Sequence, residues 1–283
     1  MNFEFEAIGT HWYIETTTIP DAAEDLRDAI TSRIAEFEDA YSRFIPESIV
    51  GQIARSAGTY KMPSDFTALF KIYQQMYIHT AGAMTPLIGS ALVQAGYDAT
   101  YSLVSKPITS VPALPNVLSY TAPNLKVIQP VQLDFGAAGK GYLIDIVGEV
   151  LEAFGIKSYL IDAGGDIRAR GPKSWRIGLE NPSDVTEAIG VIELKNQSLC
   201  GSAGNRRAWG NYTHIINPHT KSSPTNIKGV WALAQNTLLA DALTTALQFT
   251  SIDELHKHYK FDALILYTDG TISSSGKMQV VLF

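Results

Sequence analysis

The chain has 283 residues, 46% of them hydrophobic, which is enough to bury the core of one large domain or two small ones. Its 28 acidic and 22 basic residues give a net charge of −6, and no stripe of lysines and arginines could neutralise a phosphate backbone. Nucleic acid is therefore not an expected partner. The single cysteine, Cys200, excludes an internal disulfide, and no Cys/His cluster has zinc-like spacing, so a reducing compartment is expected.

No segment offers about 20 consecutive apolar residues, so no membrane span is predicted. The first 18 residues alternate charged and aromatic side chains, whereas a secretory signal needs a basic head and an unbroken apolar stretch. As the sequence stands, we expect a cytoplasmic protein. A leader trimmed from the chain would instead place the protein outside the cytoplasm.

The first half of the chain mixes strand and helix patterns. Residues 3–17 alternate like a strand, and a long amphipathic helix is predicted from Pro20, with apolar residues at helical spacing up to Phe44. Residues 63–80 repeat the helical pattern behind Ser64, a predicted capping residue. Residues 98–124 are rich in Pro, Ser and Thr and predict an irregular crossing.

The second half alternates strands and helices more regularly. Strands are predicted over residues 126–134, 157–171 (with a turn), 175–182 and 229–235, helices over 141–155 and 238–250, and a hairpin over 262–283. The mixture without repeats favours an α+β or α/β fold, of which we expect α+β. Because no linker separates independent parts, we expect one mixed helix and sheet domain over residues 1–283, which could be built as two lobes around a site.

The stretch "LDFGAAGKGYLID", residues 133–145, places small residues and Lys140 between an extended run and a helix predicted from about Tyr142. Backbone amides at such a helix start favour an anion. A Walker phosphate loop is absent because Gly141 follows Lys140, and the dinucleotide fingerprint fails because two alanines follow Gly136. Two interpretations stay open: an anion-holding turn, or small residues that let a helix pack closely on a strand.

Asp241 and Thr245 lie four residues apart in "ADALTTAL" and share one face of the predicted helix. Magnesium accepts one or two carboxylates together with neutral oxygens, so the pair is chemically sufficient for part of a metal site. A helix cap or a solvated face is the alternative. The helix start is expected to keep Asp241 ionised at neutral pH without a special partner.

Eight short segments occur in the order typical of one family. They are "IGT" (8–10), "SRFIPES" (42–48), "GAMTPLIGSAL" (82–92), "DFGAAGKGY" (134–142), "GGDI" (164–167), "GSAGN" (201–205), "HIINP" (214–218) and "ADALTTA" (240–246). Over nearly its full length the chain resembles the FAD:protein FMN transferase family, also called ApbE. No single segment is decisive, but their shared order is hard to explain by chance.

The resemblance implies an Mg²⁺-dependent enzyme that takes FAD, releases AMP and joins FMN to a Thr or Ser hydroxyl of an acceptor flavoprotein. It implies metal binding by the Ala137 carbonyl, Asp241 and Thr245, and contact of Lys140 with the FAD phosphates. His214 is the implied base for the attacking hydroxyl; its alternative is a strand histidine bonded to a neighbouring carbonyl. The implied FAD-binding residues are Ile8, Phe44, Ala83, Met84, Thr85, Lys140 and Ile215.

Some positions depart from the family pattern. Thr85 stands where Asp is usual, Ala54 falls near a usual Asn, and Asn217 replaces an Asp, while Ala203 and Gly139 are further exchanges. The first three remove polar contacts or charge near the predicted site. An FAD pyrophosphatase that releases FMN and AMP, and a weakly active flavin-binding protein, are therefore the alternative functions.

Overall fold

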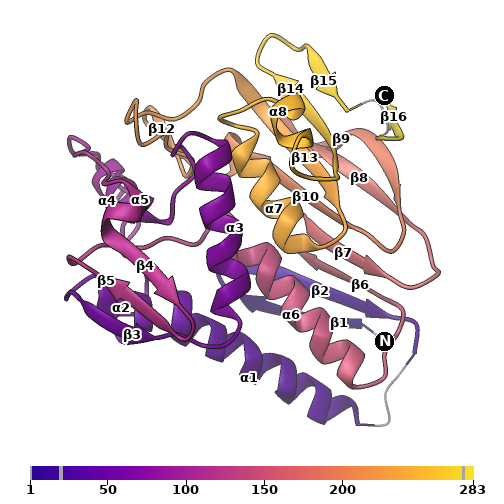
Figure 1. Cartoon of the computed structure of the whole chain (residues 1–283). Coiled ribbons are helices and arrows are strands. Elements are labelled where there is room, and N and C mark those ends of the chain that lie inside the picture. Colours follow the sequence, from indigo (N-terminus) through magenta and orange to yellow (C-terminus); the bar gives the residue numbers. More distant parts are fainter. Residues whose placement is uncertain (1, 19–21, 276–277) are drawn as a thin grey trace. The chain divides into compact units, whose positions relative to one another are not determined.

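The structure is a computed structural model that describes residues 2–18, 22–275 and 278–283, apart from the side chains of residues 205 and 206. The chain divides into two compact units (Figure 1). The first unit consists of residues 1–35, 138–205 and 226–283, and the second of residues 36–137 and 206–225. Both kinds of secondary structure occur throughout, which confirms the mixed α+β class. The single-domain boundaries 1–283 stay a prediction.

The first unit contains an eight-stranded antiparallel sheet with the order β1-β2-β6-β7-β10-β13-β14-β15. Its strands are β1 (Asn2–Ala7), β2 (Thr10–Thr16), β6 (Tyr159–Ala163), β7 (Asp166–Arg170), β10 (Ser198–Ala203), β13 (Ile227–Ala234), β14 (Asp262–Tyr267) and β15 (Ile272–Ser274). The single strand predicted over residues 3–17 is wrong. Ile8 and Gly9, with φ of 47° and 70°, form a turn that divides it into β1 and β2. The hairpin predicted over residues 262–283 is confirmed for β14 and β15, but it ends at Ser274, and β16 (Val280–Leu282) pairs with β9 (Asp184–Leu194) instead.

A smaller sheet of the same unit has the order β16-β9-β8. Its strands are β8 (Trp175–Asn181), β9 (Asp184–Leu194) and β16 (Val280–Leu282). Apolar side chains of β8 and β9 form one core cluster with Leu160, Ile167, Leu199, Trp231, Leu233 and Leu264 of the large sheet. Sequence patterning missed β9 and β10, because the first half of β9 is exposed and polar and β10 is built largely of small residues.

Two helices of the first unit, α6 (Gly139–Ala153) and α7 (Thr237–Ala246), pack against each other and against the large sheet, as Figure 1 shows. Alternate residues of a strand face opposite sides of a sheet. Ile167 and Leu199 therefore belong to the core shared with the smaller sheet, whereas Arg168 and Cys200 reach residues of α6 and α7. The predicted helices are confirmed, and α6 begins three residues before Tyr142.

Two further helices show local sequence signals of helix formation. The short helix α8 (Ile252–His256) is capped by Ser251, whose hydroxyl accepts from the amide of Glu254. The helix α1 (Ala23–Tyr41) confirms the predicted amphipathic pattern, but it ends before Phe44, which is exposed; Pro20 lies outside the described residues. Its buried side chains recur at helical spacing: Leu26, Ile30, Ile34, Phe37 and Tyr41.

The second unit combines a three-stranded sheet, β3-β5-β4, with short helices. Its elements are α2 (Ile49–Ile53), β3 (Gly58–Lys61), α3 (Phe66–His79), η1 (Pro86–Ile88), α4 (Gly89–Ala95), α5 (Leu114–Val117), β4 (Leu118–Thr121), β5 (Asn124–Val127), β11 (Ala208–Trp209) and β12 (Tyr212–Thr213). A turn of 3-10 helix, η2 (Gly204–Arg207), precedes β11.

Three predictions in this unit need correction. Helix α3 is present, but Asp65 rather than Ser64 occupies its N-cap and makes no capping bond through its side chain. The crossing at residues 98–124 is irregular only up to Ala113, because α5 and β4 follow. The strand predicted over residues 126–134 ends at Val127. Pro130 has no N–H for a ladder, and the amide of Asp134 donates to Pro86 instead.

Candidate functional site

Lys140, in the first turn of α6, is held by the turn that joins β6 to β7. Its ammonium lies 2.5 Å from a carboxylate oxygen of Asp166 and donates to the carbonyl of Ala163 at 2.9 Å. Burial lowers the pKa of Lys140, but the carboxylates of Asp166 and Asp241 outweigh it, so the pKa lies above its usual value. Lys140 is therefore a fixed positive charge at neutral pH.

Asp241 lies in the middle of α7 with 7% of its surface exposed, and its Oδ2 accepts a hydrogen bond from the amide of Gly141 at 2.8 Å. Burial, followed by the negative charge of Asp166, raises its pKa to about 8, although Lys140 and the Gly141 amide act in the opposite direction. The expectation that a helix start alone keeps this carboxylate ionised is wrong. Its position in the fold adds burial and a second carboxylate, which the helix dipole cannot offset.

Gly141 explains why the turn at residues 134–142 is built of small residues. A Cβ atom added there would lie 2.3 Å from the carbonyl oxygen of Thr237 and 2.6 Å from Cβ of Asp241. Only glycine therefore allows α6 and α7 to approach closely enough for the Gly141 amide to reach Asp241. The two interpretations left open by the sequence are compatible, because close packing here brings Lys140 and Asp241 into one cluster.

Sequence reasoning missed Asp145, which caps α7 from the neighbouring helix. Its two carboxylate oxygens accept from the amides of Thr237 at 3.0 Å and Leu238 at 2.8 Å, and Arg168 of β7 donates to the same carboxylate. Asp145 therefore fixes the start of α7 four residues before Asp241. A charged residue within the apolar helical run at residues 143–147 was the available indication.

In the second unit, Arg43 forms a buried ion pair with Asp134, the first residue of the same small-residue motif. Its Nε donates to Asp134 at 2.6 Å and an Nη donates to the carbonyl of Tyr97 at 2.9 Å. The guanidinium lies 4.1 Å from the ring centre of Phe44 and 4.8 Å from that of Tyr97. Phe44 also stacks on Tyr101, with 37% and 53% of these two residues exposed.

The predicted FAD-binding residues lie in different environments. Within the second unit, Phe44 is exposed, whereas the others are buried: Ala83, Met84, Thr85 and Ile215. The Thr85 hydroxyl caps η1 by accepting from the amide of Leu87 at 3.2 Å. In the first unit, Ile8 is half-buried in the turn between β1 and β2. No contact described within either unit tests their role in FAD binding, which stays a prediction.

His214 follows β12 and is half-buried, and its amide donates to the carbonyl of Arg207 at 3.2 Å. Nearby, the side chain of Asn217 accepts from the amide of His219 at 2.9 Å and forms a local turn. An Asp side chain offers the same acceptor, so the Asn217 exchange preserves this turn while removing a charge. The role of His214 as a base stays a prediction.

The predicted metal ligands divide between the units. Asp241 and the half-buried Thr245 lie one helical turn apart on α7 of the first unit, while Ala137 belongs to the second unit. Among the residues that the structure describes, no group of three or more His, Cys, Asp and Glu side chains could hold a metal ion. A set with one carboxylate and neutral oxygens fits Mg²⁺. Burial first and the charge of Asp166 second raise the pKa of Asp241, and a nearby cation would favour its ionised form.

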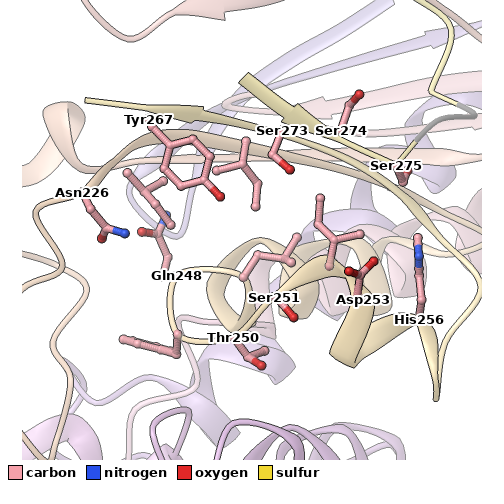
Figure 2. Close-up of a pocket in the computed structure, with 15 residues that line it drawn as sticks. Asn226, Gln248, Thr250, Ser251, Asp253, His256, Tyr267, Ser273, Ser274 and Ser275 are labelled. Carbon is pink, nitrogen blue, oxygen red and sulfur yellow. The ribbon is translucent and has the colours of Figure 1, made fainter. Parts of the chain in front are cut away.

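A pocket of about 590 Å³ lies elsewhere in the first unit (Figure 2). It is lined by residues from the segment that follows α7, from α8, from the start of β13 and from β14 and β15, and the hydroxyls of Tyr267 and Ser273 point into it. Its lining includes none of the predicted site residues. The pocket is therefore separate from the cluster around Lys140.

Comparison with known proteins places this chain in a family. The model of the ApbE family matches residues 8–265. An FAD:protein FMN transferase of Rhodobacter capsulatus is 25% identical over 264 residues, which are 86% of this chain and 50% of the relative. One of Klebsiella pneumoniae is 22% identical over 93% of this chain and 82% of the relative. The chain thus spans about half the length of the Rhodobacter relative.

Solved structures agree on the fold. The flavin transferase ApbE from Vibrio cholerae superposes with a TM-score of 0.82 at 20% identity, over 97% of this chain and 96% of the other. The ApbE protein from Thermotoga maritima gives a TM-score of 0.86 at 22% identity with the same coverage. With the family model matching most of its length, the chain belongs to the ApbE family, and the predicted membership is confirmed. Within the described residues, no helix has the length and apolarity to cross a membrane.

Proposed function

We propose that this protein transfers FMN from FAD to a Thr or Ser hydroxyl of an acceptor protein, in an Mg²⁺-dependent reaction that releases AMP. The observation that carries the proposal is the cluster of Lys140, Asp166 and Asp241 around the Gly141 amide, in a chain of the ApbE family. Relatives in that family carry the name FAD:protein FMN transferase. A fixed ammonium beside a buried carboxylate suits a pyrophosphate and its cation.

Asp241 and Thr245 are the residues that would hold Mg²⁺ in the first unit, and the resemblance adds the carbonyl of Ala137. The ion, when bound, would neutralise charge on the pyrophosphate oxygens. Asp241 is suited to this role because its carboxylate is nearly buried and already oriented by the Gly141 amide.

The residues of the chain would then act by positioning and proton transfer. Lys140 binds a pyrophosphate oxygen and stabilises the charge that develops there. The acceptor hydroxyl forms a bond to the phosphorus of the FMN half, the bond from that phosphorus to the AMP oxygen breaks, and AMP leaves with the electron pair. The proton of the hydroxyl passes to an imidazole nitrogen of His214.

The test is incubation of the protein with FAD, Mg²⁺ and a candidate acceptor, followed by in-gel flavin fluorescence and intact-mass measurement of the acceptor. We expect a fluorescent acceptor heavier by one FMN, and one AMP released for each transfer. Free FMN and AMP with an unlabelled acceptor would identify an FAD pyrophosphatase instead. Unchanged FAD that remains bound would identify a flavin-binding protein.

A further inference from the structure

The two-residue turn between β6 and β7 has a geometry that only glycines adopt easily. Gly164 and Gly165 both have positive φ, 63° and 93°, and Ala163 pairs directly with Asp166 across the turn. Two central residues with positive φ match the twist of the flanking strands. The turn therefore places the carbonyl of Ala163 and the carboxylate of Asp166 at one end of the hairpin.

Both residues that flank the glycines contact the same ammonium group. Lys140 donates to the Ala163 carbonyl at 2.9 Å and lies 2.5 Å from Oδ2 of Asp166. The other carboxylate oxygen, Oδ1, accepts from the amide of Gly201 on β10 at 3.3 Å, so Asp166 is itself tied to the next strand. An ammonium has three protons, and these two contacts account for two of them.

The carboxylate of Asp166 is not needed to brace the turn. Asp162 already does so, because its Oδ1 accepts from the amide of Gly165 at 2.8 Å. The side chain of Asp166 is only 2% exposed, and burying a carboxylate costs free energy unless a cation compensates it. The charge of Asp166 therefore acts on Lys140. Without this ion pair, the flexible side chain of Lys140 would leave its ammonium mobile.

We propose that Asp166 is a positioning residue, which together with the Ala163 carbonyl holds two donors of Lys140 and aims the third at the ligand's phosphate oxygen. This inference rests on the proposed function of the same site. It assigns the "GGD" segment a purpose: the glycines make the tight turn, and the aspartate orients the lysine. Asp166 acts through Lys140 and touches no reacting atom.

The first experiment uses the apo protein and needs no flavin. Lys140 acetylation by a limiting amine-reactive reagent is followed by peptide mass spectrometry in the parent, in Asp166→Asn and in Asp162→Asn. We expect several-fold faster labelling of Lys140 in Asp166→Asn, because its ammonium is released from the carboxylate. Asp162→Asn keeps an Oδ1 acceptor for Gly165 and should label like the parent. Equal labelling of all three proteins would overturn the proposal.

The second experiment is a double-mutant cycle on kcat/KM for FMN transfer, with Lys140→Met, Asp166→Asn and the double variant. We expect Asp166→Asn to lower kcat/KM about tenfold or more in the parent and less than about twofold in the Lys140→Met background. Equal losses in both backgrounds contradict a role through Lys140. If Asp166→Asn does not fold, Asp166→Glu keeps the charge and displaces the carboxylate, and the same comparison is made with it. A parent without transfer refutes the proposed function, while the labelling result still decides the inference.

Discussion

The motif at residues 134–142 contributes one residue to each of two ion pairs, Arg43–Asp134 and Lys140–Asp166. The two pairs differ in the surroundings of the cation. In the second unit, the side chain of Arg43 is 3% exposed, bonded to Asp134 and the Tyr97 carbonyl, and covered by two aromatic rings. In the first unit, the side chain of Lys140 is 27% exposed, beside Asp166 and under the influence of Asp241. The guanidinium is almost completely buried within the protein, whereas the ammonium of Lys140 is partly exposed and has one donor left for a ligand. The first pair therefore serves the fold, and the second suits the chemistry.

The largest expected effect is the loss of stability on replacing Arg43, which tests whether the Arg43–Asp134 pair serves the fold. Arg43→Met should lower the free energy of unfolding by about 3 kcal/mol or more, because it leaves Asp134 partly buried without its cation. Chemical denaturation measures this. Arg55→Met is the matched control, since Arg55 is half-exposed and pairs with an exposed Glu47, and it should change stability by less than about 1 kcal/mol. Similar losses in both variants would remove the distinction.

Asp241→Asn keeps the shape of the side chain and removes its charge. We expect the transfer rate to fall by ~10² or more, about 3 kcal/mol of transition-state stabilisation, and the Mg²⁺ concentration for half-maximal rate to rise steeply. A titration of rate against Mg²⁺ provides the measurement. The parent's Mg²⁺ dependence in this variant would rule out Asp241 as a ligand.

His214→Ala distinguishes two roles for this residue of the second unit: a base for the attacking hydroxyl, and a contact that binds FAD. A base acts on the attacking hydroxyl and not on bound FAD, so the rate should fall by ~10² while FAD affinity changes little. Single-turnover transfer and FAD titration measure the two quantities separately. Parallel loss of both would assign His214 to FAD binding instead.

The raised pKa of Asp241 predicts a pH dependence of stability in the metal-free protein. Its pKa is about 8 in the folded protein and about 4 when unfolded, so between these values the folded state holds a proton that the unfolded state has released. The free energy of unfolding should therefore fall as the pH rises from about 4 to about 8, by at most about 1.4 kcal/mol per pH unit. Denaturation at several pH values measures this slope, and Asp241→Asn should reduce it. A slope that this variant leaves unchanged contradicts the assignment.

The smallest effect distinguishes two neighbouring threonines of α7. Thr245→Val removes the predicted ligand oxygen and should lower the rate about tenfold at limiting Mg²⁺, with partial recovery at high Mg²⁺. Thr244 is 1% exposed, and its hydroxyl donates to the Asp241 carbonyl. Thr244 therefore contributes to the stability of α7, although it does not lie on the face of the predicted metal ligands. Thr244→Val should cost about 1 kcal/mol of stability and leave the Mg²⁺ dependence unchanged. A larger shift in Mg²⁺ dependence for Thr244→Val would reverse the assignment.

The sequence by itself determined the features that depend on neighbours along the chain. Helical spacing placed Asp241 and Thr245 on one face of α7, the apolar pattern predicted α1, α3 and α6, and the order of short motifs identified the family. Predictions from local patterns were wrong where a backbone amide bonds to a distant segment and not to the expected strand partner. The run at residues 126–134 is an example, because its last amide bonds to Pro86 and not to a strand partner.

Only the tertiary structure decided how the chemistry is arranged within the first unit. Gly141 and Asp241 are 100 residues apart in sequence, and their hydrogen bond depends on a helix approach that a single Cβ would block. The charge state of Asp241 depends on burial and on Asp166. At the start of α7, the local N-cap Asn236 accepts from Leu239, and Asp145 of another helix adds acceptors for the amides of Thr237 and Leu238. Desolvation and Coulomb interactions depend on distance in space, which sequence spacing does not supply.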